Sequence, residues 1–175
     1  IALTGKGRVG GGALEIIHKM NLKEVSPDAI LNEAFNEPVY TVLGVDNYNE
    51  KKDGSDFIKS DFYNNPSEFK SAFMKYAQVA DIYIACHYWD GEAPFIFTRE
   101  DAKNPNWNIK VVADISCDID GPVASTLRPS TIADPIYGYN PKTESEDDFM
   151  KEDVVAVMAV DNLPCELPKD ASVDF

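Results

Sequence analysis

The chain has 175 residues, enough for one domain with a sizeable core, and 44% of them are hydrophobic. Thirty acidic residues against sixteen basic ones give a formal net charge of -14 at pH 7. Such a chain repels nucleic-acid phosphates and anionic lipids, so we expect no nucleic acid and no membrane among its partners. An anionic ligand would have to be held by local backbone N–H groups.

The cysteine and histidine content favours a reducing compartment and no metal site. Cys86, Cys117 and Cys165 are widely spaced without a C-x-x-C pair, and only two histidines are present. No apolar run approaches the roughly 20 residues that cross a bilayer, and no secretory signal opens the chain. We therefore expect a cytoplasmic protein without a bound metal.

Apolar strands and amphipathic helices alternate along the chain. Continuous apolar or β-branched runs predict strands at residues 1–4, 39–45, 81–86, 110–115 and 154–160. Helical spacing or a capping residue predicts helices at residues 10–20, 27–35, 66–78 and from Thr98 onward. Residues 46–65 are polar and favour a loop with a possible short strand. The alternation predicts a Rossmann-type, doubly wound parallel sheet in a three-layer α/β/α arrangement.

Both ends of the chain resemble cut points. The sequence begins without a methionine inside the first predicted strand and stops at Phe175, in what reads as the start of a helix. We therefore expect residues 1–175 to form one NAD(P)-binding domain excised from a larger two-domain enzyme.

A glycine motif follows the first strand and opens the first helix. Its sequence is Gly5-Lys6-Gly7-Arg8-Val9-Gly10. The first glycine permits a tight turn, the second lets the backbone approach a pyrophosphate, and the third lets the helix pack closely on the strand. The helix N-terminus, with Arg8 and Val9, would present free N–H groups to the phosphates. A merely structural glycine-rich turn is the alternative. Gly11 and Gly12 are costly in a helix, so we expect close contact with a ligand or a neighbouring segment to keep them.

An acid at the end of the second strand of the fold is expected to bind the adenosine ribose. Asp46 is the best candidate, although it lies farther along than the usual spacing of about 20 residues, which implies an insertion at 25–37. An acid there would repel a 2′-phosphate, so we expect NAD as the cofactor, with NADP as the alternative because Lys51 and Lys52 follow. Asp46 could also be a solvated loop aspartate without a role in binding.

Three later segments carry a family resemblance. They are residues 113–121 (ADISCDIDG), 128–135 (RPSTIADP) and 160–172 (VDNLPCELPKDAS). Together with residues 4–20 they resemble the nucleotide-binding domain of the alanine dehydrogenase/pyridine nucleotide transhydrogenase superfamily. Within it the chain is most similar to lysine-forming saccharopine dehydrogenase and lysine–2-oxoglutarate reductase. The resemblance covers most of the chain apart from about residues 24–65.

The resemblance implies a two-domain enzyme in which this domain holds NAD(P) and another holds most of a small amino-acid or 2-oxo-acid substrate. It implies hydride transfer between the nicotinamide and an imine of an amino acid and a 2-oxo acid. The lysine and histidine that serve as acid and base in saccharopine enzymes would belong to the missing substrate domain. The isolated chain is then expected to bind cofactor without turnover.

The resemblance also assigns residues to the nicotinamide end of the site. Asp118 corresponds to the aspartate that alanine dehydrogenases use there, and it follows a parallel strand, where ligands meet such sheets. Asp114 and Asp120 would be orienting or structural, and Asp114 also counts among the expected cofactor-binding residues. Asn162 and Leu163 would line the nicotinamide pocket.

Arg128, Cys86 and His87 are further candidates for the site. Arg128 could bind a substrate carboxylate or form a salt bridge to a neighbouring acid. Cys86 and His87 follow the strand at 81–86, so their backbone should pass close to the cofactor. The His87 side chain could be structural or could handle protons.

Other functions fit parts of the pattern. A non-catalytic NAD(P)-sensing module would use the same turn, and an alanine dehydrogenase-like enzyme would belong to the same superfamily. A methyltransferase also has a glycine-rich first turn followed by an acid, but segment 160–172 argues against it.

Overall fold

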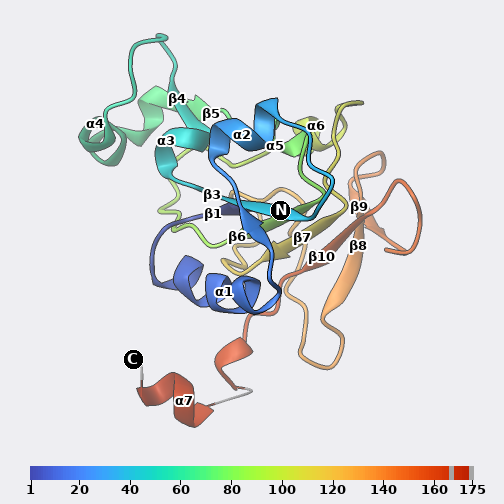
Figure 1. Ribbon diagram of the computed structural model, residues 1–175. Coiled ribbons are helices and arrows are strands. Elements are labelled where there is room, and N and C mark those ends of the chain that lie inside the picture. The colour runs from blue at the N-terminus through green and yellow to red at the C-terminus, as the bar shows by residue number, and fades with distance from the viewer. Residues whose placement is uncertain (166–167, 174–175) are drawn as a thin grey trace.

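An eight-stranded sheet runs through the centre of the molecule (Figure 1). The structure is a computed structural model that describes residues 1–165 and 168–173. The strands of this sheet are β1 (Ala2–Thr4), β2 (Lys23–Glu24), β3 (Val39–Leu43), β6 (Ile82–Ala85), β7 (Val111–Asp114), β8 (Ile136–Asn140), β9 (Ser145–Asp147) and β10 (Val155–Met158). Their spatial order is β2-β3-β1-β6-β7-β10-β8-β9.

In this spatial order, the six strands β2, β3, β1, β6, β7 and β10 are parallel to their neighbours. β8 and β9 then extend the sheet beyond β10 as an antiparallel hairpin. β1 lies between β3 and β6, with Leu3 paired to Val42 on one side and to Ile84 on the other. The doubly wound α/β class predicted from the sequence is confirmed. The hairpin was not predicted, although Tyr137 and Tyr139 are both buried in it ahead of an Asn-Pro turn.

Helices cover both faces of the sheet. Their bounds are α1 (Arg8–Lys19), α2 (Pro27–Asn32), α3 (Val45–Tyr48), α4 (Lys59–Asn64), α5 (Met74–Ala77), α6 (Arg99–Ala102) and α7 (Pro168–Val173), with 3₁₀ turns at Pro66–Glu68 and Leu163–Cys165. Figure 1 shows α1 on one side of the sheet and α2, α5 and α6 on the other. This arrangement is the three-layer one expected.

Two hydrophobic clusters, one on each face, follow from the alternation of side chains along the strands. On the α1 face, Ile17 packs with Leu3, Tyr40 and Cys86. On the opposite face, a larger cluster joins the alternate strand residues to α2, α5 and α6, and Tyr83 lies fully buried within it. The parallel strands that α1 covers are therefore buried from both sides, which explains their continuous apolar sequences.

The capping signals at Ser26 and Thr98 are confirmed. The Ser26 hydroxyl accepts a hydrogen bond of 3.0 Å from the Ala29 N–H at the start of α2. The Thr98 and Asp101 side chains cap each other's backbone N–H groups at α6. Helix α2 ends at Asn32, earlier than expected, because the backbone of Glu33 is extended.

The helix predicted at residues 66–78 is wrong. Phe69–Ser71 form strand β5, which pairs antiparallel with β4 (Asn49–Lys51) in a separate two-stranded sheet, and only Met74–Ala77 are helical. Phe69 packs edge-on against Phe57 and Phe62, whereas Phe73 packs against Tyr83 in the main core. Aromatic residues at helical spacing thus belong to two different clusters, and tertiary contacts override the helical pattern.

Several expectations fall partly or wholly beyond the described residues. Glu166 and Leu167 of the segment 160–172, and the helix start expected at Phe175, lie outside them. None of the helices in the described ranges is long and apolar enough to span a bilayer.

Replacing different glycines of α1 by alanine should change the free energy of unfolding in opposite directions. A Cβ at Gly10 would collide with the Gly5 carbonyl oxygen, whereas a Cβ at Gly11 or Gly12 would meet nothing within 4 Å. Within the described residues, no neighbouring segment approaches Gly11 or Gly12 closely, and contact with a ligand stays a prediction. Gly12→Ala should raise the free energy of unfolding by up to about 1 kcal/mol, because alanine is the better helix former.

Gly10→Ala is the matched control and should lower the same quantity by about 1–3 kcal/mol, because the Gly5 backbone cannot yield without opening the turn. Urea unfolding followed by far-ultraviolet circular dichroism measures both. Equal shifts in the two variants would contradict this account of the helix.

Candidate functional site

A cavity of about 550 Å³ opens at the carboxyl ends of β1, β3, β6 and β7. Segments that are far apart in the sequence form its wall, and four of them follow directly on a strand. The glycine turn follows β1, α3 follows β3, residues 86–89 follow β6, and residues 116–118 follow β7. Ligands of doubly wound sheets bind at this edge, where the strand order reverses.

The glycine turn forms one wall of the cavity because it packs directly on the end of β6. Gly5 has a φ of 98°, and a Cβ there would collide with the Cys86 carbonyl oxygen and lie 2.9 Å from the His87 nitrogen. The Gly5 N–H donates to the Leu43 carbonyl at 3.1 Å, which fixes the turn to β3 as well. Only glycine fits this position.

The N-terminus of α1 opens into the same space. Gly7 is the N-cap residue, and a Cβ there would meet nothing within 4 Å. Arg8 and Val9 line the cavity, and the first N–H groups of a helix have no partner within it. The 12-residue α1 therefore presents donors and a partial positive charge to the cavity.

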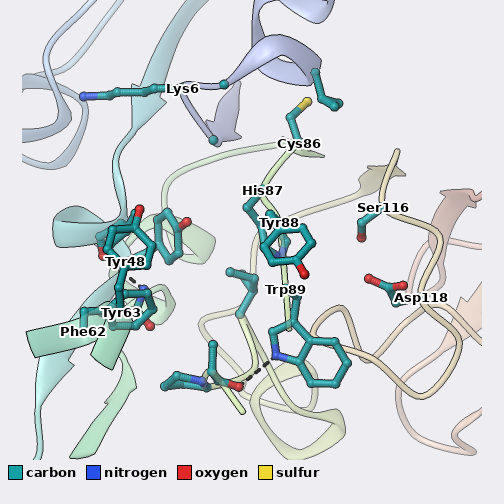
Figure 2. Close-up of a pocket in the computed structure, with 18 of the residues that line it drawn as sticks. Lys6, Tyr48, Phe62, Tyr63, Cys86, His87, Tyr88, Trp89, Ser116 and Asp118 are labelled. Carbon is teal, nitrogen blue, oxygen red and sulfur yellow. Dashed lines mark hydrogen bonds between the residues drawn. The ribbon is translucent and has the colours of Figure 1, made fainter. Parts of the chain in front are cut away.

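Aromatic side chains line the cavity from two sides. Figure 2 shows Tyr48, Phe62 and Tyr63 on one side and Tyr88 and Trp89 on the other. Tyr88 is 89% exposed and Tyr63 is 60% exposed, so both rings are free to stack on a planar group. The Trp89 indole N–H donates to the Ala93 carbonyl at 2.8 Å, which holds its ring in place.

His87 is a buried residue that lines the cavity beside these aromatic side chains. Burial lowers the pKa of His87 from 6.5 to about 4, so the ring is uncharged at neutral pH. Its Nδ1 lies 3.1 Å from the Thr4 hydroxyl, which in turn lies 2.8 Å from the Tyr83 hydroxyl. Its Nε2 has no hydrogen-bond partner among the described residues. The chain of contacts anchors the ring to β1 and β6.

The acidic end of the cavity lies after β7. Asp118 is partly buried and lines the cavity with Ser116. Burial and the nearby charge of Asp114 both raise the pKa of Asp118. The loop is tightly wound, because Cys117 has a φ of 56° and the Gly121 N–H donates to the Asp118 carbonyl at 3.0 Å. This turn holds the Asp118 carboxyl toward the cavity (Figure 2).

Relatives of the chain are large multidomain proteins. It is 29% identical to alpha-aminoadipic semialdehyde synthase of Arabidopsis thaliana, over 98% of this chain and 18% of that protein. The mitochondrial protein of the same name from Rattus norvegicus is 26% identical, over 98% of this chain and 21% of the relative. The chain is a distant homologue of alpha-aminoadipic semialdehyde synthase.

One further relative and one solved structure are also similar to the chain, the structure in fold alone. Saccharopine dehydrogenase [NAD(+), L-lysine-forming] of Neurospora crassa is 27% identical over 55% of this chain and 25% of that protein. An L-alanine dehydrogenase structure matches with a TM-score of 0.50 and 15% identity, over 98% of this chain and 39% of that chain. No protein-family profile matches. The resemblance predicted from the sequence is confirmed, and the chain spans about a fifth of the length of the synthases that it matches.

The cavity brings together many, but not all, of the site residues that the sequence predicted. Those that line it are Gly5, Gly7, Arg8, Val9, Cys86, His87 and Asp118. Gly10 lies beneath the turn and supports it. Asp46 is exposed in α3, at the carboxyl end of β3 but off the cavity wall. Asn162 and Leu163 follow β10, are exposed, and stay predictions for the nicotinamide end.

Asp114 is not among the residues that line the cavity, so its surroundings favour the orienting or structural role given for it, and its contribution to cofactor binding stays a prediction. It is fully buried, and its carboxylate accepts hydrogen bonds from the Ser116 N–H, the Ser116 hydroxyl at 2.6 Å and the Thr126 hydroxyl at 2.6 Å. These three donors compensate the buried charge. Asp114 therefore shapes the loop that carries Ser116 and Asp118.

Arg128 forms a salt bridge to a neighbouring acid, which is the second of the two interpretations given for it. Its guanidinium forms a bidentate pair with Glu146, at 2.8 and 2.7 Å, and lies over the Tyr137 ring. Because this cation is already paired, we leave Arg128 out of the substrate site.

The sequence pattern missed Lys6, Ser116 and the aromatic residues as parts of the wall. Lys6 lies inside the glycine motif and Ser116 inside the segment 113–121, so their positions after strands were available signals. Tyr48, Phe62 and Tyr63 belong to a region of polar composition that predicted a loop.

The low pKa of His87 predicts a pH-dependent stability. Between pH 6.5 and about 4 the unfolded chain binds a proton at His87 that the folded chain does not, so the free energy of unfolding falls as the pH falls through this window. The contribution is at most about 3 kcal/mol. His87→Gln removes the titrating group, and its urea unfolding curves should lose part of the wild-type slope between these pH values. Parallel pH profiles for the two proteins would contradict a neutral, buried His87.

Proposed function

We propose that this chain is the nucleotide-binding domain of an NAD(P)-dependent amino-acid oxidoreductase of the saccharopine dehydrogenase and lysine–2-oxoglutarate reductase type. The observation that carries the proposal is the glycine turn, which holds the N-terminus of α1 at a 550 Å³ cavity in a chain homologous to alpha-aminoadipic semialdehyde synthase. In a chain with a net charge of -14, these local N–H groups and Arg8 are what can hold a pyrophosphate.

The residues of the wall suit the parts of a dinucleotide. The pyrophosphate would bind at Gly7, Arg8 and Val9, where donors and open space coincide. The adenine would stack on the aromatic side chains, of which Tyr63 and Tyr88 are the most exposed. NAD(P) supplies hydride transfer at the nicotinamide ring.

Asp118 is the catalytic residue that we propose in this chain. Its carboxyl lies across the cavity from the turn, beside Ser116, where the nicotinamide end of an extended ligand would lie. A carboxylate there can accept a hydrogen bond from the nitrogen of an amino-acid or imine substrate and so orient it. The acid and base groups would come from a substrate domain outside this chain, so we expect this chain to bind cofactor without turnover.

Titration with NADH, followed by tryptophan fluorescence, tests whether the chain binds a dinucleotide. A saturable change in emission is expected. Trp89 lines the cavity and Trp107 packs in the core against Phe97, so bound NADH should quench mainly the Trp89 emission. Trp89→Phe is the control, because it should remove most of the signal while calorimetry still detects binding.

The titration also discriminates between functions. Binding of S-adenosylmethionine without binding of NADH or NADPH would overturn the proposal in favour of a methyltransferase. A longer protein that contains this domain should oxidise NAD(P)H when lysine and 2-oxoglutarate are added. Dinucleotide binding without turnover of any amino acid would favour the sensing module, and turnover with alanine would favour an alanine dehydrogenase-like enzyme.

Asp118→Asn tests the catalytic assignment in that longer protein. Turnover should fall by about a hundredfold or more, because the orienting carboxylate is lost, while NADH affinity should change little. Asp120→Asn is the matched control, since Asp120 is exposed in the same loop and forms only a long ion pair of 3.5 Å with Arg99. Equal turnover in the two variants would contradict the role of Asp118.

A further inference from the structure

Part of the sheet is open on the face that carries α1. Side chains alternate along a strand, so Val112 of β7 points into the larger cluster and is fully buried, whereas Val111 points the other way and is 38% exposed. Residues paired across neighbouring strands point to the same face. We call the half-buried or exposed apolar residues there the open sheet face: Ile82, Val111, Ala113, Ile136, Ala156 and Met158. Within residues 1–165 and 168–173, none of them packs into either hydrophobic cluster or lines the cavity.

One flank of α1 borders the open sheet face and is apolar as well. His18 Nε2 lies 3.1 Å from the Tyr40 hydroxyl of β3, so that side of the helix faces β3. The opposite flank carries Val9, Ile16 and the C-cap residue Met20 at helical spacing, exposed by 51, 59 and 58%. Met20 lines a hollow together with the first residue of β6, which places this flank beside the open sheet face.

The open sheet face and the flank of α1 form a groove about as wide as one helix. On its far side the turn after β9 closes it, because a Cβ on Gly138 would lie 2.7 Å from the Phe149 nitrogen, and Gly138 shares a face with Ala156. Neighbouring strands lie about 4.8 Å apart and packed helices about 8–10 Å apart. A helix packed beside α1 would therefore lie over β7, the strand that carries Val111.

A second copy of this chain fits the groove poorly. α1 rises above the sheet by about a helix diameter, roughly 10 Å, and so holds a flat partner sheet away from Val111. The helix of a second copy would have to enter with its outward side, which carries Arg8, Glu15 and Lys19, all exposed. Charged side chains are costly to bury on an apolar surface. The groove instead suits an amphipathic helix with an apolar stripe toward the sheet and α1.

The path of the chain after β10 leads to this side of the sheet. The 3₁₀ turn Leu163–Cys165 precedes α7, and Figure 1 shows α7 on the same side of the sheet as α1. The relatives are about five times longer than this chain, which spans 18% and 21% of two of them. Parallel sheets are covered on both faces by helices of their own chain, so a helix reached through α7 is the fitting occupant.

We infer that the open sheet face and the apolar flank of α1 are a docking groove for an amphipathic helix that follows α7 in a longer protein containing this domain. The groove is on the face of the sheet, whereas the cavity is at the carboxyl edge, so the inference does not depend on the proposed function. The docked helix completes the second layer of the domain and removes its largest bare apolar strand surface from water.

Comparing this chain with the longer protein tests the inference, with 1-anilinonaphthalene-8-sulfonate as the probe of exposed apolar surface. At equal molar concentration the chain should give several-fold stronger dye emission than the longer protein. Val111→Lys should weaken the emission of the chain without lowering its urea midpoint, because the ammonium reaches water. In the longer protein the same substitution buries a charge under the helix and should lower the midpoint by about 1 M or more.

Two matched variants separate docking from general damage. Val111→Ile keeps the apolar surface and should leave the midpoint of the longer protein close to that of wild type. Ile58→Lys places a charge on an apolar residue of similar exposure, 50%, at the start of α4 and away from the groove, and should change neither protein.

Three results would overturn the inference. The first is a longer protein that tolerates Val111→Lys as well as this chain does, which would leave the groove open to water. The second is a concentration-dependent dimer of both proteins that Val111→Lys dissociates, which would make a second copy the occupant. The third is equal dye emission from this chain and from the longer protein.

Discussion

The close approach of the glycine turn to the end of β6 is the constraint on which the site depends. Gly5 adopts a positive φ and leaves no room for a side chain beside the Cys86 carbonyl, and Gly10 leaves none beside the carbonyl of Gly5. These two contacts bring α1 down onto β1 and fix the direction of its N-terminus. A helix held even slightly farther away would present its free N–H groups to solvent and not to the cavity.

The cavity is electrically polarised although the whole chain is strongly acidic. Lys6, Arg8 and the helix N-terminus make one end positive, and Asp118 makes the other end negative. The wall between them is aromatic, with the neutral His87 at its floor. This arrangement suits an extended ligand with phosphates at one end and a reacting group that meets an amino-acid nitrogen at the other. The overall charge of -14 carries no information about that local pattern.

Sequence patterns were reliable where a structure is set by neighbours along the chain, and they failed where distant segments decide it. The turn at Gly5, the cap at Ser26 and the buried strands follow from short-range rules. The helix expected at 66–78 failed because Phe69 finds Phe57 and Phe62 and pairs with β4, contacts that no local pattern contains. The unpredicted hairpin of β8 and β9 likewise depends on pairing with β10.

The sequence by itself determined the Rossmann-type class and the glycine turn, because glycines and apolar strands report backbone requirements directly, and three later segments carried the family resemblance. Only the tertiary structure decided which polar side chains are available to a ligand. Asp114 and Asp118 are four residues apart, yet one is enclosed by three donors and the other faces the cavity. Arg128 is paired with Glu146, whereas the described residues include no ion pair of Lys6, because the fold decides which partners lie beside a charged group.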